Sequence, residues 1–223
     1  MKVAAIVPAL NEEKNVGSVL KTLLSSKEVD EVILLDDGST DRTSQIGREL
    51  GARVISLPKK GGSGKGNAMK EAVNRTDADI VAFFDADLIG LSAEHVSSLI
   101  LPVLENRSVM CIGARQRWGG LPGFFIKLDP LLAIGGERAM KRFVFDNMPV
   151  RFLKGFEVET ALNYYCLIKK LKVSYAVLKG LDIVVKEKKW GLYRGLKSRI
   201  RMVWQLIKVR FLIRFYKKEF KDV

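Results

Sequence analysis

Residues 78–87 read Ala-Asp-Ile-Val-Ala-Phe-Phe-Asp-Ala-Asp, an apolar run that ends in two carboxylates. Five consecutive apolar residues, rich in branched and aromatic side chains, are typical of a strand that is buried on both faces of a parallel sheet. Ligands of open α/β sheets bind just outside the carboxyl ends of the strands, which is where Asp85 and Asp87 fall. Because hard divalent cations such as Mg2+ and Mn2+ prefer oxygen ligands, the pair is a candidate metal site. An Asp at a strand end followed by an Asp that caps a helix would give the same short pattern.

Strand-like and helix-like segments alternate on both sides of this run. We expect strands at 2–7, 31–35, 53–57, 80–84 and 109–114, and helices that begin near Asn11, Thr40, Asn67 and Ser92. This alternation predicts an α/β fold with a mainly parallel sheet flanked by helices. The loops at 8–12, 36–41 and 85–87 each follow a strand, so they should share one edge of that sheet.

The pattern changes after residue 115. A long loop is expected over 115–130, a short helix around 135–145, a helix that begins near Gly155, strands at 172–178 and 182–185, and a basic amphipathic helix over 192–216. We therefore predict one domain over residues 1–190, whose halves are 1–115 and 116–190, and a basic helical tail over 191–223.

The chain has 223 residues and a net charge of +13, and this charge is concentrated at one end. The last 38 residues carry 13 Lys/Arg against 3 Asp/Glu, whereas the preceding 185 carry 25 against 22. A basic tail suits an anionic partner such as a membrane surface, an anionic acceptor or a nucleic acid. Two cysteines without CxxC spacing and a first strand that starts at once predict a cytoplasmic protein without a disulfide framework.

Two further loops have residue types that suit a nucleotide. Residues 61–66 are rich in glycine and contain Lys65, but they match neither a P-loop nor a dinucleotide fingerprint, so a phosphate contact and a flexible turn both stay open. Asp36 and Asp37 end a strand, and a carboxylate there can accept a hydrogen bond from a base or a ribose. The Ser39-Thr40-Asp41 part is by itself ordinary turn and helix-cap chemistry.

Four motifs in order give the chain a family resemblance. They are Val7-Pro8-Ala9-Leu10-Asn11-Glu12-Glu13, Asp36-Asp37-Gly38-Ser39-Thr40-Asp41, Gly64-Lys65-Gly66-Asn67-Ala68 and Asp85-Ala86-Asp87. Together they resemble the nucleotide-sugar-binding half of family 2 glycosyltransferases, which have the GT-A fold. The resemblance covers residues 1–115 and extends more weakly through 155–160. The most similar types are the glucosyl- and mannosyl-3-phosphoglycerate synthases and the polyprenyl-phosphate sugar transferases.

The resemblance implies a role for each motif in binding a nucleoside-diphosphate sugar. The loop with Pro8, Leu10 and Glu12 would line the nucleoside pocket. Asp36, together with Asp37, would hold the base, and Lys65 would reach toward the base or the diphosphate. Asp85-Ala86-Asp87 would be the DxD motif, whose two carboxylates touch the ribose and a Mg2+ or Mn2+ ion. Such an ion neutralises the charge of the leaving diphosphate.

The second half would supply the acceptor side. Many relatives add a metal ligand two residues after the DxD or a late histidine. Ile89 stands at the first place, and the single histidine, His95, is expected to be a surface or cap residue. Glu157 is our candidate for the catalytic carboxylate, which would act as base in an inverting enzyme or position a sugar in a retaining one. Glu159, Arg115 and Arg138 are candidates for the acceptor site. Charge complementarity at a helix start remains an alternative for the two acids, and a surface salt bridge is an equal alternative for Arg138.

The sequence alone does not identify the acceptor or the partners. The basic, Trp-containing tail favours a polyprenyl-phosphate or other membrane-proximal acceptor, and its apolar stripe also suits membrane contact, self-association into a homodimer or packing on the domain. A body without a predicted spanning helix permits a small anionic acceptor such as a phosphoglycerate. The alternatives to a UDP- or GDP-sugar transferase are a nucleotidyltransferase and, from the tail charge alone, a nucleic-acid-binding module.

Overall fold

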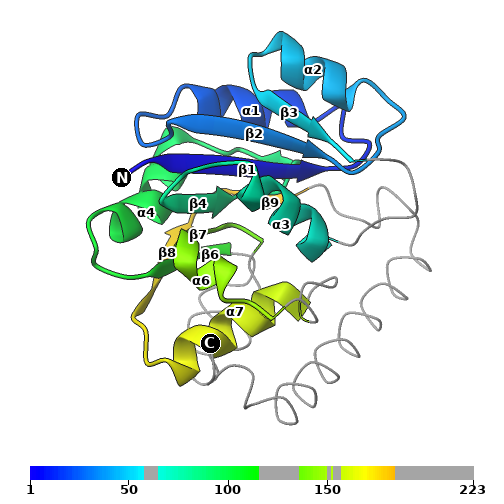
Figure 1. The fold of residues 1–223 in the computed structure, drawn as a ribbon. Coiled ribbons are helices and arrows are strands. Elements are labelled where there is room, and N and C mark those ends of the chain that lie inside the picture. The colour runs from blue at the N-terminus through cyan, green and yellow to red at the C-terminus, as the bar shows by residue number, and fades with distance from the viewer. Residues whose placement is uncertain (58–64, 116–135, 150–151, 153–156, 184–223) are drawn as a thin grey trace, which may run out of the picture.

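The computed structural model describes residues 1–57, 65–115, 136–149, 152 and 157–183, and within these ranges a seven-stranded sheet forms the centre of the fold. Figure 1 shows the sheet between two layers of helices. The strands are β1 (Val3–Ala9), β2 (Glu31–Asp36), β3 (Arg53–Ser56), β4 (Ile80–Phe83), β5 (Leu88–Ile89), β6 (Met110–Arg115), β7 (Arg138–Lys141), β8 (Val173–Leu178) and β9 (Asp182–Ile183). The helices are α1 (Val16–Leu24), α2 (Thr43–Glu49), α3 (Lys65–Asn74), α4 (Ala93–Leu104), α6 (Arg142–Asp146) and α7 (Glu157–Ile168).

The strand order is β3-β2-β1-β4-β7-β6-β8, and β5 pairs separately with β9. Within the seven-stranded sheet, neighbouring strands are parallel except around β7, which runs antiparallel to both β4 and β6, and the separate β5–β9 pair is also antiparallel. The predicted mainly parallel α/β sheet is confirmed.

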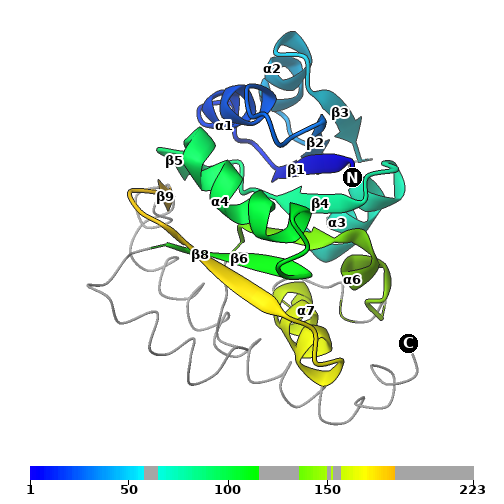
Figure 2. The same ribbon diagram turned by 90° about the vertical axis from the view of Figure 1, so that its left-hand side faces the viewer.

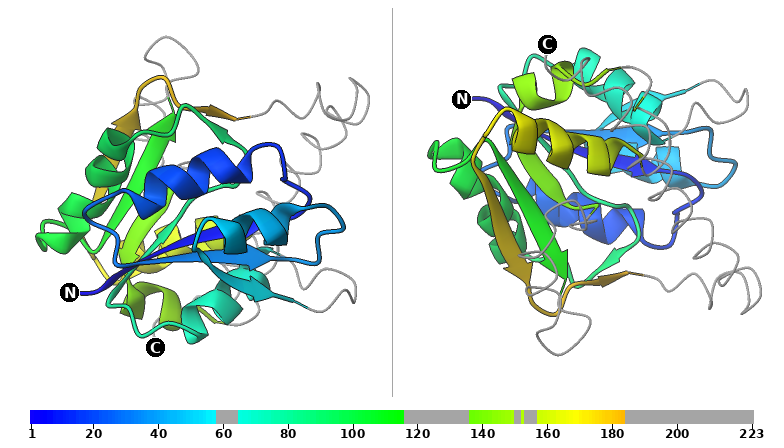
Figure 3. Two further views of the ribbon diagram at one scale, coloured as in Figure 1. Left: turned by 90° about the horizontal axis from the view of Figure 1, so that it is seen from above. Right: turned by 90° about the horizontal axis from the view of Figure 1, so that it is seen from below.

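β4 lies in the middle of the sheet and is buried on both faces, as its apolar sequence predicted. Val81 and Phe83 join the core beneath α3, α6 and α7, where the rings of Phe83 and Phe145 lie 5.6 Å apart. Ile80 and Ala82 join the core beneath α1, α2 and α4 on the opposite face. Figures 2 and 3 show these two helical layers from the side, from above and from below.

One predicted element is wrong. The short helix expected around residues 135–145 is instead strand β7 followed by the single-turn helix α6. β7 contains Arg138, and the charged residue Glu137 lies directly before it. Both are fully buried, so the segment lacks the apolar run by which the other strands were recognised.

Helix α1 also starts later than the sequence predicted. The strand before it continues through Pro8 to Ala9, and α1 begins only at Val16. Asn11, the expected helix start, has a left-handed backbone with φ of +55°. The expected C-terminal helix over 192–216 lies outside the described residues.

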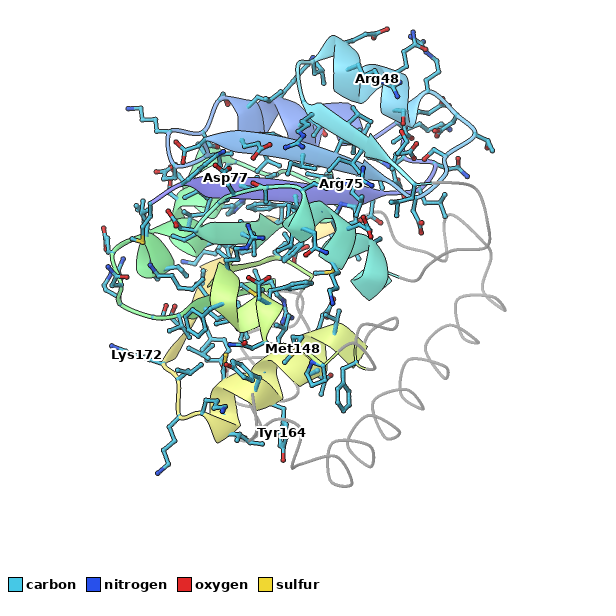
Figure 4. The ribbon with its side chains drawn as sticks, in the orientation of Figure 1. Arg48, Arg75, Asp77, Met148, Tyr164 and Lys172 are labelled. Carbon is cyan, nitrogen blue, oxygen red and sulfur yellow. The ribbon has the colours of Figure 1, made fainter. Side chains whose placement is uncertain are left out.

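The two edges of the sheet differ in their chemistry. At the amino-terminal edge Lys2 pairs with Asp77, and Glu31 accepts a hydrogen bond from Arg53 at 2.7 Å. Figure 4 shows Asp77 at this edge. These exposed or partly exposed pairs contribute little to stability, because water and salt screen their charges. The opposite edge carries the loops with the predicted site residues. None of the helices in the described part of the chain is long and apolar enough to cross a membrane.

Candidate active site

Three predicted loops leave the sheet side by side. β1 lies between β2 and β4 and is parallel to both, and Ala9 at its end is paired with Asp36. The backbone N–H of Phe84, just past β4, donates to the carbonyl of Ile6 at 3.1 Å. The loops after residues 9, 36 and 84 therefore start at the same edge, which confirms the predicted convergence.

The first two loops are joined to each other by side chains. The backbone N–H of Asn11 donates to Ser39 Oγ at 2.9 Å, and the N–H of Thr40 donates to Asn11 Oδ1 at 2.8 Å. The N–H of Glu12 donates to Thr43 Oγ1 at 2.8 Å. The N-cap of α2 has no side-chain hydrogen bond, so the expected helix-capping role of Ser39 or Thr40 is wrong. These side chains instead hold the loop after β1 against the loop after β2.

Asp36 and Asp37 have different environments. Asp36 is 5% exposed, and its oxygens accept hydrogen bonds from the Ser39 N–H at 2.9 Å and from Ser44 Oγ at 2.5 Å. Asp37 is half-buried, and its carboxylate accepts no hydrogen bond from the described residues. Burial and then the charge of Asp36 raise the pKa of Asp37. Asp36 thus shapes the loop, while Asp37 keeps the acceptor capacity that a base N–H requires.

We expect the variants Asp36→Ala and Asp37→Ala to separate these roles. Asp36→Ala leaves the Ser39 N–H without its acceptor and should lower the free energy of unfolding by about 2 kcal/mol. Asp37→Ala removes a carboxylate that burial disfavours, so it should leave stability unchanged or slightly higher. Its effect should appear as weaker nucleotide binding. Urea unfolding and nucleotide titrations of both variants check this, and an unstable Asp37→Ala with normal binding would contradict it.

The DxD motif follows β4 directly. Ala86 is buried, which places the two flanking carboxylates, both half-buried, on a fixed segment between β4 and β5. Asp85 lies against the backbone of Gly136: a Cβ atom built on that glycine would stand 2.3 Å from Asp85 Oδ2. Two carboxylates held at a strand end are a donor set that fits a hard divalent cation.

His95 is a structural residue, as the sequence predicted. The backbone N–H of His95 donates to Ser92 Oγ at 3.4 Å, and the His95 ring Nδ1 accepts a hydrogen bond from the backbone N–H of Ser92 at 3.2 Å. These two bonds form a capping box at the start of α4. The Nε2 of His95 lies 2.9 Å from the carbonyl oxygen of Lys179. No three His, Cys, Asp or Glu side chains of the described residues gather into a further metal site.

A buried polar cluster connects β7 with α7. Arg138 is fully buried, and its Nη1 donates to the carbonyl of Glu159 at 3.3 Å and to Asn163 Oδ1 at 3.4 Å. Its Nη2 lies 3.8 Å from Glu159 Oε2. Burial lowers the pKa of Arg138, and the charges of Glu159, Glu137 and Asp85 oppose this shift. Arg138 and Glu159, two predicted acceptor residues, are thus brought together, and Asn163 was not predicted because nothing in its spacing sets it apart.

The other predicted residues lie around the same edge. Pro8 is half-buried in β1, Leu10 is 52% exposed, and Glu12 accepts a hydrogen bond from Asn15 Nδ2 at 3.2 Å. The backbones of Lys65, Arg115 and Glu157 mark the start of α3, the end of β6 and the start of α7. The side chains of these three residues lie outside the described part of the structure.

The sequence model of Glycosyl transferase family 2 matches residues 4–156, which include all three of these loops. The chain belongs to glycosyltransferase family 2. This membership favours glycosyl transfer over the nucleotidyltransferase and nucleic-acid-binding alternatives, and the resemblance drawn from the four motifs is confirmed.

Several relatives of this family are glucosyl-3-phosphoglycerate synthases. The enzyme of Mycolicibacterium smegmatis is 35% identical over 190 residues, which are 72% of this chain and 62% of that protein. A 4,4'-diaponeurosporenoate glycosyltransferase of Staphylococcus aureus is 35% identical over 98 residues, which are 43% of this chain and 26% of that protein. The chain spans about three fifths of the length of the synthases it matches.

Solved structures of the Mycobacterium tuberculosis synthase share the fold. A complex with Mn2+, UDP-glucose and phosphoglyceric acid has a TM-score of 0.68 and 30% identity, with 82% of this chain and 71% of that chain covered. A complex with Mn2+, UDP-glucose and glycerol 3-phosphate has a TM-score of 0.68 and 29% identity, with 82% and 72% covered. The GT-A fold is confirmed, and the structures of the relatives hold Mn2+ or Mg2+ together with UDP.

Proposed function

We propose that this protein transfers a sugar from a UDP-linked donor to a small phosphorylated acceptor with the help of Mn2+ or Mg2+. The observation that carries the proposal is the convergence of the loops after β1, β2 and β4, with Asp85 and Asp87 at the end of β4. Relatives of similar fold are solved with UDP-glucose and Mn2+.

The donor would be held by the three loops in order. The loop with Pro8, Leu10 and Glu12 would meet the nucleoside, and Asp37 would accept the hydrogen bond of the base, since both oxygens of Asp36 are engaged. Asp85 and Asp87 would hold the divalent ion, whose remaining ligands would come from the diphosphate and from water. When bound, such an ion acts as a Lewis acid that stabilises the leaving diphosphate.

A small phosphorylated acceptor is favoured over a lipid-linked one. In sequence, the glucosyl-3-phosphoglycerate synthase of Mycolicibacterium smegmatis is matched over 72% of this chain, whereas the 4,4'-diaponeurosporenoate glycosyltransferase is matched over 43%. The synthase structures of similar fold hold phosphoglyceric acid or glycerol 3-phosphate. The lipid acceptor and the membrane contact were inferred from the tail, which lies outside the described residues, and they stay predictions. Glu157 as the catalytic carboxylate and Arg115 as an acceptor contact also stay predictions.

Binding of nucleoside diphosphates tests the donor assignment. We expect UDP with Mn2+ to raise the unfolding temperature, while UDP alone, GDP and CDP raise it less. A ligand at 100 times its dissociation constant adds about 2.7 kcal/mol to the free energy of unfolding, which a thermal-shift assay resolves. A larger rise of the unfolding temperature with GDP than with UDP would show that the donor sugar is linked to GDP. No response to any nucleotide, with or without metal, would contradict the donor site.

A further inference from the structure

Gly136 approaches the DxD motif more closely than any side chain could. In the antiparallel pairing of β7 with β4, Arg138 is opposite Phe83, so two residues further out Gly136 comes opposite Asp85. A Cβ atom on Gly136 would stand 2.3 Å from Asp85 Oδ2, 2.8 Å from Cγ and 2.9 Å from Oδ1. All three distances are shorter than real Cβ contacts, so any larger residue would have to displace the carboxylate.

Position 136 requires glycine because a side chain there would clash with Asp85, and not because of its backbone conformation. Glycines with positive φ among the described residues are Gly38, Gly51, Gly90 and Gly180. Gly136 is not one of them, so an alanine there would meet no conformational penalty of the left-handed region. Its cost would come from the contact with Asp85.

Among the described residues, two other glycines would bring an added Cβ closer than 3.0 Å to a neighbouring atom, and in both cases that atom belongs to a leucine side chain. A Cβ on Gly47 would stand 2.4 Å from Leu34 Cδ2 and 3.0 Å from Val54 Cγ2. A Cβ on Gly113 would stand 2.6 Å from Leu178 Cδ1. These two glycines serve core packing. Gly136 instead makes room for a carboxylate of the proposed metal site.

The same face of β7 also carries a positive charge. Residues two apart in a strand point to the same side of the sheet, so Arg138 follows Gly136 on the face where Asp85 lies. Its guanidinium donates hydrogen bonds to the carbonyl of Glu159 and to Asn163 Oδ1 of α7, and it lies 3.8 Å from the Glu159 carboxylate. The negative charge of Asp85 is one of those that oppose the lowering of the Arg138 pKa by burial. Gly136 therefore offers space to the Asp85 carboxylate, and Arg138 at the start of β7 carries a positive charge on the same face of the sheet.

We propose that Gly136 is a positioning residue for Asp85: its missing side chain lets the carboxylate lie against the backbone just before β7. This fixes where one oxygen donor of the cation site stands. The inference rests on the proposed function, because the cation and the UDP-linked donor are assigned there. Ligand sites tolerate displacements of only about 0.5 Å, so a shifted Asp85 should weaken metal-dependent nucleotide binding.

The variant Gly136→Ala tests the effect on binding. We expect the dissociation constant for UDP in the presence of Mn2+ to rise tenfold or more. Gly47→Ala is the matched control, because its added Cβ also clashes, but with Leu34. It should lower the unfolding temperature and leave the dissociation constant within about twofold of wild type.

A double-mutant cycle with Asp85→Ala, measured without any ligand, tests the contact itself. Gly136→Ala should lower the unfolding temperature in the wild-type background and have little effect in the Asp85→Ala background, where the clashing atoms are gone. If Gly136→Ala alone does not fold, folding of the double variant is the expected rescue, and failure of both would contradict the contact.

These experiments test the positioning role of Gly136 separately from the proposed function. Normal Mn2+-dependent UDP binding by Gly136→Ala would overturn the positioning role alone, as would an equal loss of stability in both backgrounds. A wild-type protein that binds no UDP in the presence of Mn2+ would overturn the proposed function, and the positioning role with it.

Discussion

Replacement of Asp87 by alanine is expected to lower the rate of sugar transfer by about a thousandfold. Asp87 follows β4 at the edge where the three loops converge, and its half-buried carboxylate is one of two oxygen donors proposed for the cation. Without it the charge that develops on the leaving diphosphate would lose part of its stabilisation in the transition state. The measurement is the kcat for transfer from UDP-glucose at saturating Mn2+.

Asp77→Ala is the matched control for this change. It removes the same charge from an exposed side chain at the opposite edge of the sheet, where Asp77 pairs with Lys2 (Figure 4). Its kcat should stay within about twofold of wild type, because exposed ion pairs contribute little. An Asp87→Ala protein that keeps most of its metal-dependent rate would contradict the role of Asp87 in holding the ion.

Replacement of Arg138 by methionine should lower the free energy of unfolding by about 3–5 kcal/mol. Arg138 is fully buried, and its loss would remove the guanidinium that lies 3.8 Å from the carboxylate of Glu159, which is 4% exposed. Such a loss is a large part of the 5–15 kcal/mol that typically separates folded from unfolded proteins. Urea unfolding measures it.

Two further variants give this prediction its controls. Arg53→Ala removes an arginine whose side chain is 51% exposed and pairs with Glu31, so it should cost about 0–1 kcal/mol. Glu159→Gln combined with Arg138→Met should recover part of the stability, because the buried negative charge that faced Arg138 is gone. A stable Arg138→Met protein with a raised KM for the acceptor would show instead that Arg138 contacts the acceptor, as the sequence alone suggested.

Elements that contain a run of apolar residues could be predicted from the sequence. The apolar run 80–84 predicted β4, which ends one residue earlier, at Phe83. β7 was missed because Glu137 and Arg138 are buried charges, and hydrophobic periodicity counts charged residues as exposed. What buries them is the approach of α7 and the pairing with β4, both distant in sequence.

The residues of the candidate site also fall into those that the sequence predicts and those that only the structure reveals. Asp85 and Asp87 could be predicted because carboxylates at a strand end have few structural reasons to be there. Asp36 and Asp37 could be found as a pair but not told apart, since their difference depends on hydrogen bonds from Ser39 and Ser44. Gly136 carries no signal in the sequence, because its importance arises only when β7 pairs with β4.

The formation of product tests the proposed function most directly. The protein would be incubated with UDP-glucose, 3-phosphoglycerate and Mn2+, and the products analysed by mass spectrometry. A parallel reaction would contain a polyprenyl phosphate in place of the phosphoglycerate. We predict release of UDP together with a glucosylated phosphoglycerate, dependent on the metal and lost in Asp87→Ala. Transfer to the polyprenyl phosphate alone, or no transfer to either acceptor from any UDP-sugar, would contradict it.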